Sequence, residues 1–327
     1  MTKKSTYPQV GANKIGILYE HPQWHEPLFD ALDKRGIDYI KIDLKDGAFS
    51  IYDIPEAAVY YNLVSPSAYK RGNQRAVPFA YALCTHLERQ GKTVLNGSAS
   101  MHLELSKSAQ MGLLDELGIH HPKSLVFNSV EALRRYEDRI EFPQIIKPEQ
   151  GGSGSRMYKV NSVDEVAEIF EADPSLWLPD YLFLIQDEIH YDKDFGIIRM
   201  EFVGGELVYA MRVITNGSFN ICPSTVCNPE NPNEASACSI PTNTPPQFLV
   251  YDEISDEAIA EAKRIIKASG HQVASVEFAI NADGNRYFYD INSNSNLRAN
   301  ISEAFGSGDP FERVVDYLES YLVGELV

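Results

Sequence analysis

The sequence predicts an α/β protein in which a small open α/β unit comes before a larger part of α+β type. In residues 1–97, short apolar segments alternate with helical ones, and two helices end at Gly36 and Gly91. Such alternation is typical of a parallel sheet with helices packed on it. After residue 124 the strands instead follow one another in pairs, joined by glycine-rich turns that favour antiparallel hairpins.

The first unit is expected to contain four strands and two helices. The segment KIGILY is a short apolar run, as expected for a buried strand, and the helical segment that follows it ends at Gly36. We expect the strands at residues 14–19, 37–42, 57–63 and 93–95, and the helices at 26–35 and 79–90.

The rest of the chain is expected to form two further units after a linking helix at 106–117. One has strands at 124–127, 144–147, 157–160 and 182–186 and helices at 130–139 and 163–172. The other has strands at 196–203, 206–214, 273–280 and 286–292, with helices at 256–268 and 310–322. The expected units are therefore 1–97, 98–185 with a glycine-rich lid, and 186–327, and a chain of 327 residues is long enough for each to bury a core.

A segment rich in Asn, Pro, Ser and Thr spans residues 215–254. A loop of that length inside a compact domain is usually functional or disordered, and we expect a flap over the active site. The segment holds Cys222, Cys227 and Cys238, which suggest a zinc or redox loop. Their spacing is not CxxC and no fourth ligand is close by, so a thiol that touches substrate, or inert loop cysteines, are favoured over a metal site.

The charge of the chain argues against two classes of partner. Formal net charge is −17, from 46 acidic and 29 basic residues, and a surface this negative repels nucleic acid and anionic membranes. ATP binding remains compatible with this negative charge, provided that a few basic residues and magnesium gather in one cleft.

The N-terminus has no signal-peptide core and no apolar run is long enough to span a membrane, so we expect a cytoplasmic protein.

The segment QIIKPEQGGSGSRMYKV, residues 144–160, is the strongest local signal. An apolar strand brings Lys147 to its end, and Gly151, Gly152 and Gly154 form a turn before the next strand. Glycines let backbone N–H groups approach phosphate oxygens, and a lysine adds a positive charge. Because strands flank the loop on both sides, it is neither a Walker loop nor a dinucleotide fingerprint. A flexible hairpin with a surface lysine explains the motif equally well.

A second signal lies about 130 residues later in the chain. The strand SVEFAI carries Glu277 among apolar neighbours, and the strand YFYDIN carries Asp290 and Asn292 two positions apart, which places both on one face. If the two strands pair, Glu277 joins them. Two carboxylates and an amide oxygen are ligands that magnesium accepts, whereas a polar strand end is the alternative.

A third, weaker signal is the apolar strand LFLIQDEI, which runs into a polar loop. The end of such a strand offers backbone N–H and C=O groups to an adenine edge, and an acid such as Asp194 is placed to hold ribose hydroxyls. On its own it is an ordinary strand followed by a loop.

The order of these features resembles the ATP-grasp superfamily, close to its RimK-like and glutathione-synthetase-like carboxylate–amine ligases. The resemblance runs from about Asn96 to the C-terminus, and it implies an ATP-grasp fold preceded by a Rossmann-like α/β domain. The stretch NGSASMHLELSKSAQMGLLDELGIHHPKS is similar to the family's entry segment, and the phrases MEFVGGELVYAMRV, FNICPSTVC and YDINSNSNLRAN resemble a RimK-like subgroup.

The resemblance implies a role for each candidate residue. Lys107 and Lys147 become the ATP-binding lysines, Arg199 and Arg212 hold phosphate oxygens or an acyl phosphate, and Asp290 stands where Glu is more usual in the family. The residues implied to bind nucleotide are Lys107, Lys147, Gly151, Gly152, Ser153, Gly154, Gln186, Asp187, Glu188, Ile189 and Asp194. The implied metal ligands are Glu277, Asp290 and Asn292, and the candidates for substrate contact are Arg298, Asn220, Cys222 and His21.

The implied reaction joins a carboxylate to an amine with ATP and Mg²⁺, through an acyl phosphate and with release of ADP and phosphate. The partners implied are a small acid and a small amine of the amino-acid or short-peptide class, and homodimers are common in such enzymes. Two alternatives stay open. One is a phosphotransferase or carboxylase that uses the same ATP cleft, and the other is a nucleotide-binding regulatory module without catalysis.

Overall fold

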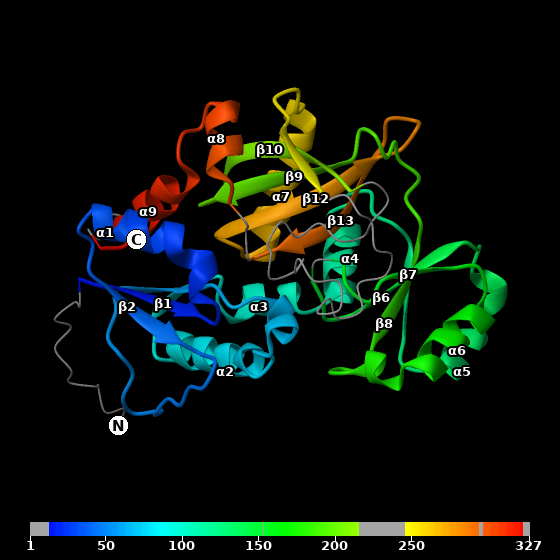
Figure 1. Cartoon of the computed structure of the whole chain (residues 1–327), viewed down its shortest axis with the longest axis horizontal. Coiled ribbons are helices and arrows are strands. Elements are labelled where there is room, and N and C mark those ends of the chain that lie inside the picture. The colour runs from blue at the N-terminus through cyan, green and yellow to red at the C-terminus, as the bar shows by residue number, and fades with distance from the viewer. Residues whose placement is uncertain (1–12, 153, 216–245, 294–296, 323–327) are drawn as a thin grey trace.

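The computed structural model describes residues 13–152, 154–215, 246–293 and 297–322. These residues form three separate β-sheets, each with its own helices (Figure 1). Of the helices in these ranges, none is both long and apolar enough to cross a membrane. The α/β class predicted from the sequence is confirmed, since every sheet is covered by helices.

The first sheet is parallel throughout, as the alternating pattern predicted. Its strand order is β2-β1-β3-β4, so β1 lies inside the sheet, and all five of its residues are buried. The strands are β1 (Ile15–Tyr19), β2 (Tyr39–Asp43), β3 (Val59–Asn62) and β4 (Thr93–Leu95). The helices are α1 (Glu26–Lys34), α2 (Ala76–Arg89) and the 3₁₀ turns η1 (Pro22–His25) and η2 (Pro66–Arg71).

The second unit is a four-stranded antiparallel sheet with two short helices on one side. The glycine-rich connection joins β6 to β7 as an antiparallel hairpin, which confirms that prediction. The strands are β5 (Ser124–Phe127), β6 (Gln144–Pro148), β7 (Tyr158–Val160) and β8 (Phe183–Asp187), in the order β5-β8-β6-β7. The helices are α5 (Val130–Arg134), α6 (Val163–Ala172), η3 (Glu137–Arg139) and η4 (Pro174–Trp177), so the helix expected at 130–139 is in fact two pieces.

The third unit is a five-stranded antiparallel sheet in the order β11-β10-β9-β12-β13. Both hairpins predicted for it are confirmed, one at Gly204-Gly205 and one at the Asn-Ala-Asp-Gly turn. The strands are β9 (Ile197–Val203), β10 (Glu206–Ile214), β11 (Gln247–Val250), β12 (Val273–Ile280) and β13 (Arg286–Asn292). The helices are α7 (Asp256–Ser269), α8 (Ala299–Phe305) and α9 (Pro310–Ser320).

Two helices and one strand were not predicted. Helix α3 (Ser98–Glu104) precedes α4 (Lys107–Glu116), and together they link the first unit to the second. Strand β11 lies inside the segment expected to be a flap, because residues 247–250 pair with the edge of β10; residues 216–245 of that segment lie outside the described part of the chain. Helix α8 is the other element that the sequence did not predict.

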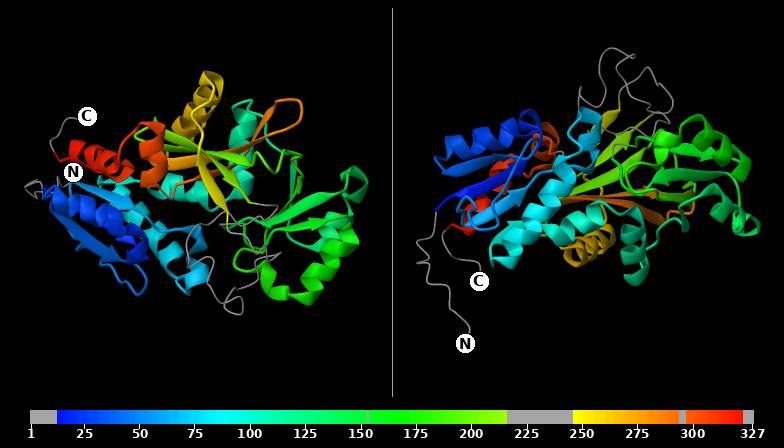
Figure 2. Two further views of the ribbon diagram at one scale, coloured as in Figure 1. Left: turned by 45° about the horizontal axis from the view of Figure 1, so that its top comes forward. Right: turned by 90° about the horizontal axis from the view of Figure 1, so that it is seen from below.

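The last helix returns to the beginning of the chain. In Figure 1, α9 lies beside α1, and Lys34 contacts Glu312 at 2.9 Å. Arg35 pairs with three carboxylates along α9, among them Glu319. The two turned views of Figure 2 show the same arrangement, with the second unit set apart on the other side of the five-stranded sheet. The division at residues 97 and 185 stays a prediction, since α9 packs on the first unit.

Candidate active site

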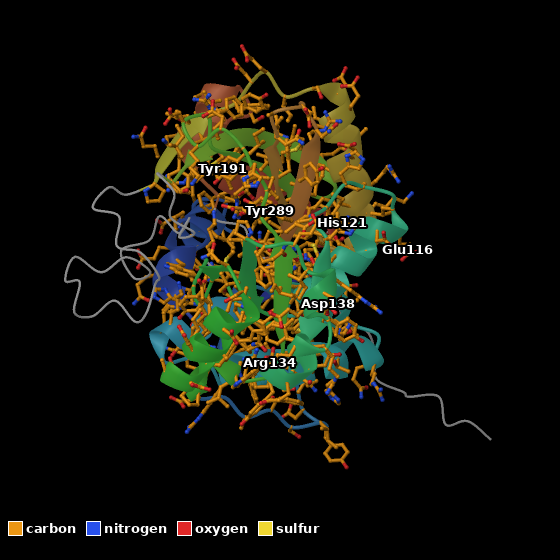
Figure 3. All side chains as sticks on the ribbon, turned by 90° about the vertical axis from the view of Figure 1, so that its right-hand side faces the viewer. Glu116, His121, Arg134, Asp138, Tyr191 and Tyr289 are labelled. Atoms are coloured by element: carbon orange, nitrogen blue, oxygen red, sulfur yellow. The ribbon has the colours of Figure 1, made fainter. Side chains whose placement is uncertain are left out.

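A cavity of about 980 Å³ lies between the four-stranded sheet of the second unit and the five-stranded sheet. It is lined by the ends of β6 and β8, by the glycine-rich loop, and by β12 and β13. Figure 3 labels Tyr191 and Tyr289, which line this cavity near the middle of the molecule. The predicted residues that line it are Lys107, Lys147, Gly151, Gly152, Gly154, Gln186, Asp187, Glu188, Ile189, Glu277 and Asp290.

Lys147 sits at the cavity end of β6, a strand whose five residues are all buried. The residue is 5% exposed, and its ammonium group has no hydrogen bond or ion pair within the described part of the chain. Burial, together with the neighbouring charge of Lys107, lowers the pKa of Lys147 to about 8. A buried ammonium group without a hydrogen bond or ion pair among the described residues is suited to bind an anion that enters the cavity.

Lys107 is the first residue of α4, and its position is set by Glu149 from the glycine-rich segment. Ser106 caps the helix by accepting the N–H of Ala109 at 3.1 Å. The carboxylate of Glu149 accepts the hydroxyls of Ser106 and Ser108, each at 2.5 Å, and the backbone N–H of Ser108 at 3.0 Å. Glu149 is not among the residues predicted from the sequence, although serines on both sides of a lysine at a helix start indicate a capped helix.

The ammonium group of Lys107 forms an ion pair with Asp290. Burial opposes the charge of Lys107, but Asp290 raises the pKa of the lysine above its ordinary value. For Asp290, burial alone would raise the pKa, yet Lys107 and Lys147 outweigh it and lower the pKa. A cation therefore already lies against this carboxylate.

The two predicted acidic strands pair as expected, and Glu277 lies directly opposite Asp290. The amide of Asn292 donates to the other oxygen of Asp290 at 3.3 Å, so the three predicted ligands lie at one end of this hairpin. Glu277 accepts a hydrogen bond from Arg199 through Oε1 at 2.7 Å, whereas its buried Oε2 has no hydrogen-bond partner within the described residues. Burial raises the pKa of Glu277 to about 7, although Arg199 opposes the shift.

These residues fit a magnesium ion. A divalent ion could bind the buried Oε2 of Glu277, which has no hydrogen-bond partner among the described residues, and could take the place of the Lys107 ammonium group beside Asp290. All the donor atoms are oxygens, as magnesium prefers. In the described ranges no three His, Cys, Asp or Glu side chains form a metal cluster. The site therefore rests on two carboxylates and the amide of Asn292.

The two candidate arginines lie on opposite faces of the five-stranded sheet. Arg199 lies opposite Glu277 across one strand pair, and its Nε donates to buried Glu201 at 2.6 Å. Arg212 lies opposite Ile198, the residue before Arg199 in β9, and neighbouring residues of a strand point to opposite faces. Its guanidinium lies over the ring of Phe195, 4.7 Å from the centroid. Arg212 therefore lies on the face of the sheet away from Glu277, and the roles of the two arginines in holding phosphate oxygens or an acyl phosphate stay predictions.

The glycine-rich loop lies against the first unit. A side chain at Gly152 would approach Cβ of Ser67 to 3.2 Å, and Gly154 has a φ of 68°, so both positions favour glycine. The hydroxyl of Ser155 is hydrogen-bonded to that of Tyr69 in η2, a contact that the sequence did not indicate. Ser153 lies outside the described residues.

At the end of β8, the cavity-lining residues direct their polar side chains to other partners. Gln186 donates to Ser124 at 2.8 Å, and Asp187 accepts from Gln144 at 3.0 Å. Glu188 forms an ion pair with Lys159 at 2.6 Å. The backbone groups of this segment are therefore what it offers to a ligand in the cavity, and their contact with an adenine stays a prediction.

Asp194, Arg298 and His21 are not among the residues that line the cavity. Asp192 lines the cavity, whereas Asp194 is exposed and donates its N–H to Asp192 at 2.9 Å. The guanidinium of Arg298 lies over the ring of Phe248, 3.6 Å from the centroid, and the ring of His21 is tilted against that of Trp24 with centroids 5.0 Å apart. The roles expected for these three residues stay predictions. Asn220 and Cys222 lie outside the described residues.

Comparison with known proteins finds a family model and a relative that match parts of the chain. Residues 105–227 match the model of the RimK-like ATP-grasp domain. The α-aminoadipate–LysW ligase LysX of Sulfurisphaera tokodaii is 26% identical over 202 residues, which cover 59% of this chain and 66% of that relative's length.

Solved structures share the fold along nearly the whole chain. A D-alanine–D-alanine ligase from Bacillus anthracis complexed with ATP aligns with a TM-score of 0.68 and 15% identity, over 95% of this chain and 97% of that one. The ATP-grasp ligase PsnB, complexed with a minimal precursor, Mg and ADP, aligns with a TM-score of 0.59 and 19% identity, over 97% and 100%. At these identities the likeness shows the fold alone.

Proposed function

We propose that this chain, which belongs to the RimK-like ATP-grasp superfamily, is an ATP-dependent ligase that joins a carboxylate to an amine. The observation that carries the proposal is the set of buried charges in one cavity. Lys107, Lys147, Glu277 and Asp290 come from three parts of the chain and meet there. The ATP complex of a D-alanine–D-alanine ligase and the Mg–ADP complex of PsnB support the use of ATP and Mg²⁺.

The nucleotide would lie in the cavity with its phosphates toward Lys107 and Lys147. Backbone groups of residues 186–189 would border the base, and the glycine-rich loop would cover the phosphates. Glu277, Asp290 and Asn292 would hold Mg²⁺, which would neutralise charge on the triphosphate. Lys107 would then exchange its bond with Asp290 for bonds to phosphate oxygens.

In the proposed reaction, a carboxylate oxygen of the substrate attacks the γ-phosphorus of ATP and the bond to the β-phosphate oxygen breaks. This gives an acyl phosphate and ADP. The amine then attacks the acyl carbon, a C–N bond forms, phosphate leaves, and the amine loses a proton. Arg199, held between Glu201 and Glu277, would stabilise the charge that develops on the transferring group.

The glycine-rich loop would act as a lid that keeps water away from the acyl phosphate, since water would hydrolyse this intermediate. The glycine-rich loop lies over the cavity and is hydrogen-bonded through Ser155 to Tyr69 of the first unit. A substrate that bridges the first unit and the five-stranded sheet would therefore lie beneath this contact. LysX and D-alanine–D-alanine ligase are named for amino-acid substrates, which supports acids and amines of that class.

The test is ADP and phosphate release across a panel of acid and amine pairs. We expect fast release only when a matching acid and amine are both present, with an amide product that mass spectrometry identifies. Equal release without the amine would instead indicate a phosphotransferase. Nucleotide binding without turnover for every pair would favour a regulatory module.

A further inference from the structure

Strand β13 carries Asp290 and Asn292 and lies at the edge of the five-stranded sheet. An edge strand has a row of backbone N–H and C=O groups with no neighbouring strand, and buried groups of this kind need other partners. On the outer side of β13 lie the linking helices α3 and α4 rather than a strand. Side chains from these helices contact the strand.

Gln110 of α4 fills the place of a neighbouring strand at Ile291. Its side-chain amide donates to the carbonyl oxygen of Ile291 at 2.8 Å, and its side-chain oxygen accepts the N–H of Ile291 at 3.1 Å. One carboxamide thus satisfies both outward groups of a residue, as a residue of a paired strand does. Gln110 is fully buried, so water cannot replace these bonds.

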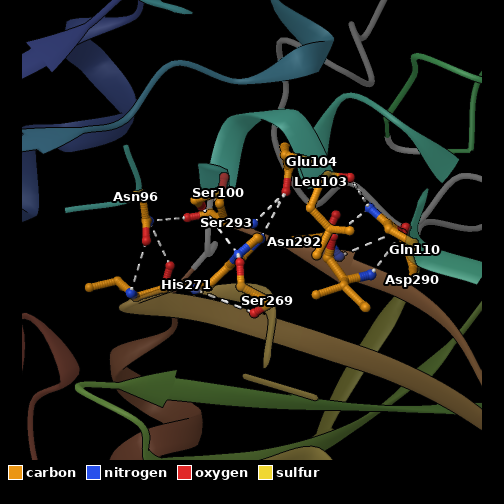
Figure 4. A network of polar contacts seen from close by, with 12 residues as sticks. Asn96, Ser100, Leu103, Glu104, Gln110, Ser269, His271, Asp290, Asn292 and Ser293 are labelled. Carbon is orange, nitrogen blue, oxygen red and sulfur yellow. Dashed lines mark hydrogen bonds and ion pairs between the residues drawn. The ribbon is translucent and has the colours of Figure 1, made fainter. Parts of the chain in front are cut away.

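The same pattern recurs two residues further along, at Ser293. Its N–H donates to the carboxylate of Glu104, and its carbonyl oxygen accepts from the amide of Asn96 at 2.6 Å. Asn96 also donates to the carbonyl oxygen of Val273 at 2.8 Å, which ties this end of β13 to β12. Figure 4 shows these contacts on both sides of Asn292.

These contacts connect Lys107, the proposed nucleotide-binding lysine of α4, to β13, the strand that carries Asp290 and Asn292. Gln110 follows Lys107 by one helical turn on α4, so both side chains lie on the same side of the helix. Lys107 reaches Asp290, and Gln110 holds the next residue of the strand, Ile291. The backbone between the two predicted ligands, Asp290 and Asn292, is therefore fixed by a side chain that, among the described residues, forms no hydrogen bond with either ligand.

We infer that Gln110, supported by Glu104 and Asn96, is a positioning residue for the magnesium site. The two hydrogen bonds between Gln110 and the backbone of Ile291 hold β13 in the register and twist that place Asp290 and Asn292 side by side. The inference rests on the proposed function, because it takes these residues as the metal ligands. Groups behind a metal ligand usually change metal affinity by about 10- to 100-fold when they are removed.

The experiment uses the full chain with Gln110→Leu, which keeps the bulk and loses both bonds. Hydrogen exchange without nucleotide or metal is expected to show faster exchange of the Ile291 amide. Titration of Mg²⁺ in the presence of ADP, read by calorimetry, is expected to show an affinity about 10-fold weaker than wild type. Gln110→Glu keeps an acceptor for the Ile291 N–H, so it is expected to retain amide protection while weakening Mg²⁺ binding less than Gln110→Leu.

Ser255→Ala is the matched control, because it removes the cap of α7 without touching β13. It is expected to lower stability and to leave Mg²⁺ affinity unchanged. Unchanged Mg²⁺ affinity or unchanged Ile291 exchange in Gln110→Leu overturns the inference. If that variant does not fold, Gln110→Glu decides by its Mg²⁺ affinity, and an affinity equal to that of the wild type overturns the inference. Failure of the wild type to bind Mg²⁺ with ADP would instead count against the proposed function, and the exchange data then decide whether Gln110 holds the strand.

Discussion

Lys147→Met is expected to lower ATP-dependent phosphate release by on the order of 10²- to 10³-fold without loss of stability. The side chain is buried at the cavity, and within the described residues its ammonium group has no hydrogen bond or ion pair that the substitution would break. Methionine keeps most of the apolar stem and removes a desolvated charge, so the melting temperature should be equal or higher. Phosphate release and thermal unfolding of the same preparation measure both effects.

Lys263→Met is the matched control for this substitution. Lys263 is an exposed lysine on α7 that pairs with Glu206 at 2.6 Å, and such surface pairs contribute little. Its loss is expected to leave phosphate release near the wild-type rate. Normal turnover by Lys147→Met would show that the lysine has no part in phosphate transfer.

The lowered pKa of Lys147 adds a pH dependence to the same residue. At pH values below about 8 the amine is charged and attracts phosphate, and above this value it loses its proton. Nucleotide affinity is therefore expected to fall as pH rises through about 8. Lys147→Arg should lack this fall, because a guanidinium stays charged.

The second large effect is expected for Glu277→Gln. Loss of a carboxylate from the proposed magnesium site should lower phosphate release by about 10²-fold or more and raise the Mg²⁺ concentration needed for half-maximal rate. Titration of Mg²⁺ in the phosphate-release assay measures both. Glu261→Gln is the control, because Glu261 pairs with Arg286 of the same hairpin at 2.7 Å but is outside the cavity.

The same substitution is expected to change how stability depends on pH. The pKa of Glu277 is raised from an ordinary 4.5 to about 7, so between these values the folded chain binds more protons than the unfolded chain. The stability that this group contributes is complete below the unfolded value and is lost as pH rises through about 7. Relative to Glu277→Gln, the wild type should lose on the order of 1 to 3 kcal/mol between acid and mildly alkaline pH. Urea unfolding at both ends of the range checks this, and parallel profiles would contradict the raised pKa.

Local sequence patterns predicted most of the fold. Glycine turns and apolar alternation placed the hairpins of β6–β7, β9–β10 and β12–β13, because backbone requirements at turns are local. The elements that were missed depend on distant partners. Strand β11 forms on the edge of β10, and α3 begins at Ser98 after Gly97, an N-cap residue that provides no side-chain cap.

In the candidate site, too, the features that depend on distant partners could not be predicted from the sequence. Strand spacing predicted that Asp290 and Asn292 share a face, but not that Arg212 and Arg199 face apart, since that depends on the register across the hairpin. The role of Gln110 was invisible in the sequence for a related reason. Its partner is the backbone of a residue 181 positions later, and no side-chain pattern marks such a contact.

The proposed reaction begins when a substrate carboxylate attacks ATP in the cavity of Lys147 and Glu277. Once a substrate pair is found, the decisive measurement uses an acid whose carboxylate is labelled with oxygen-18. An acyl-phosphate route transfers one labelled oxygen from the acid to each phosphate released, with ADP as the nucleotide product. Unlabelled phosphate, or release of AMP and pyrophosphate, would contradict the proposed reaction.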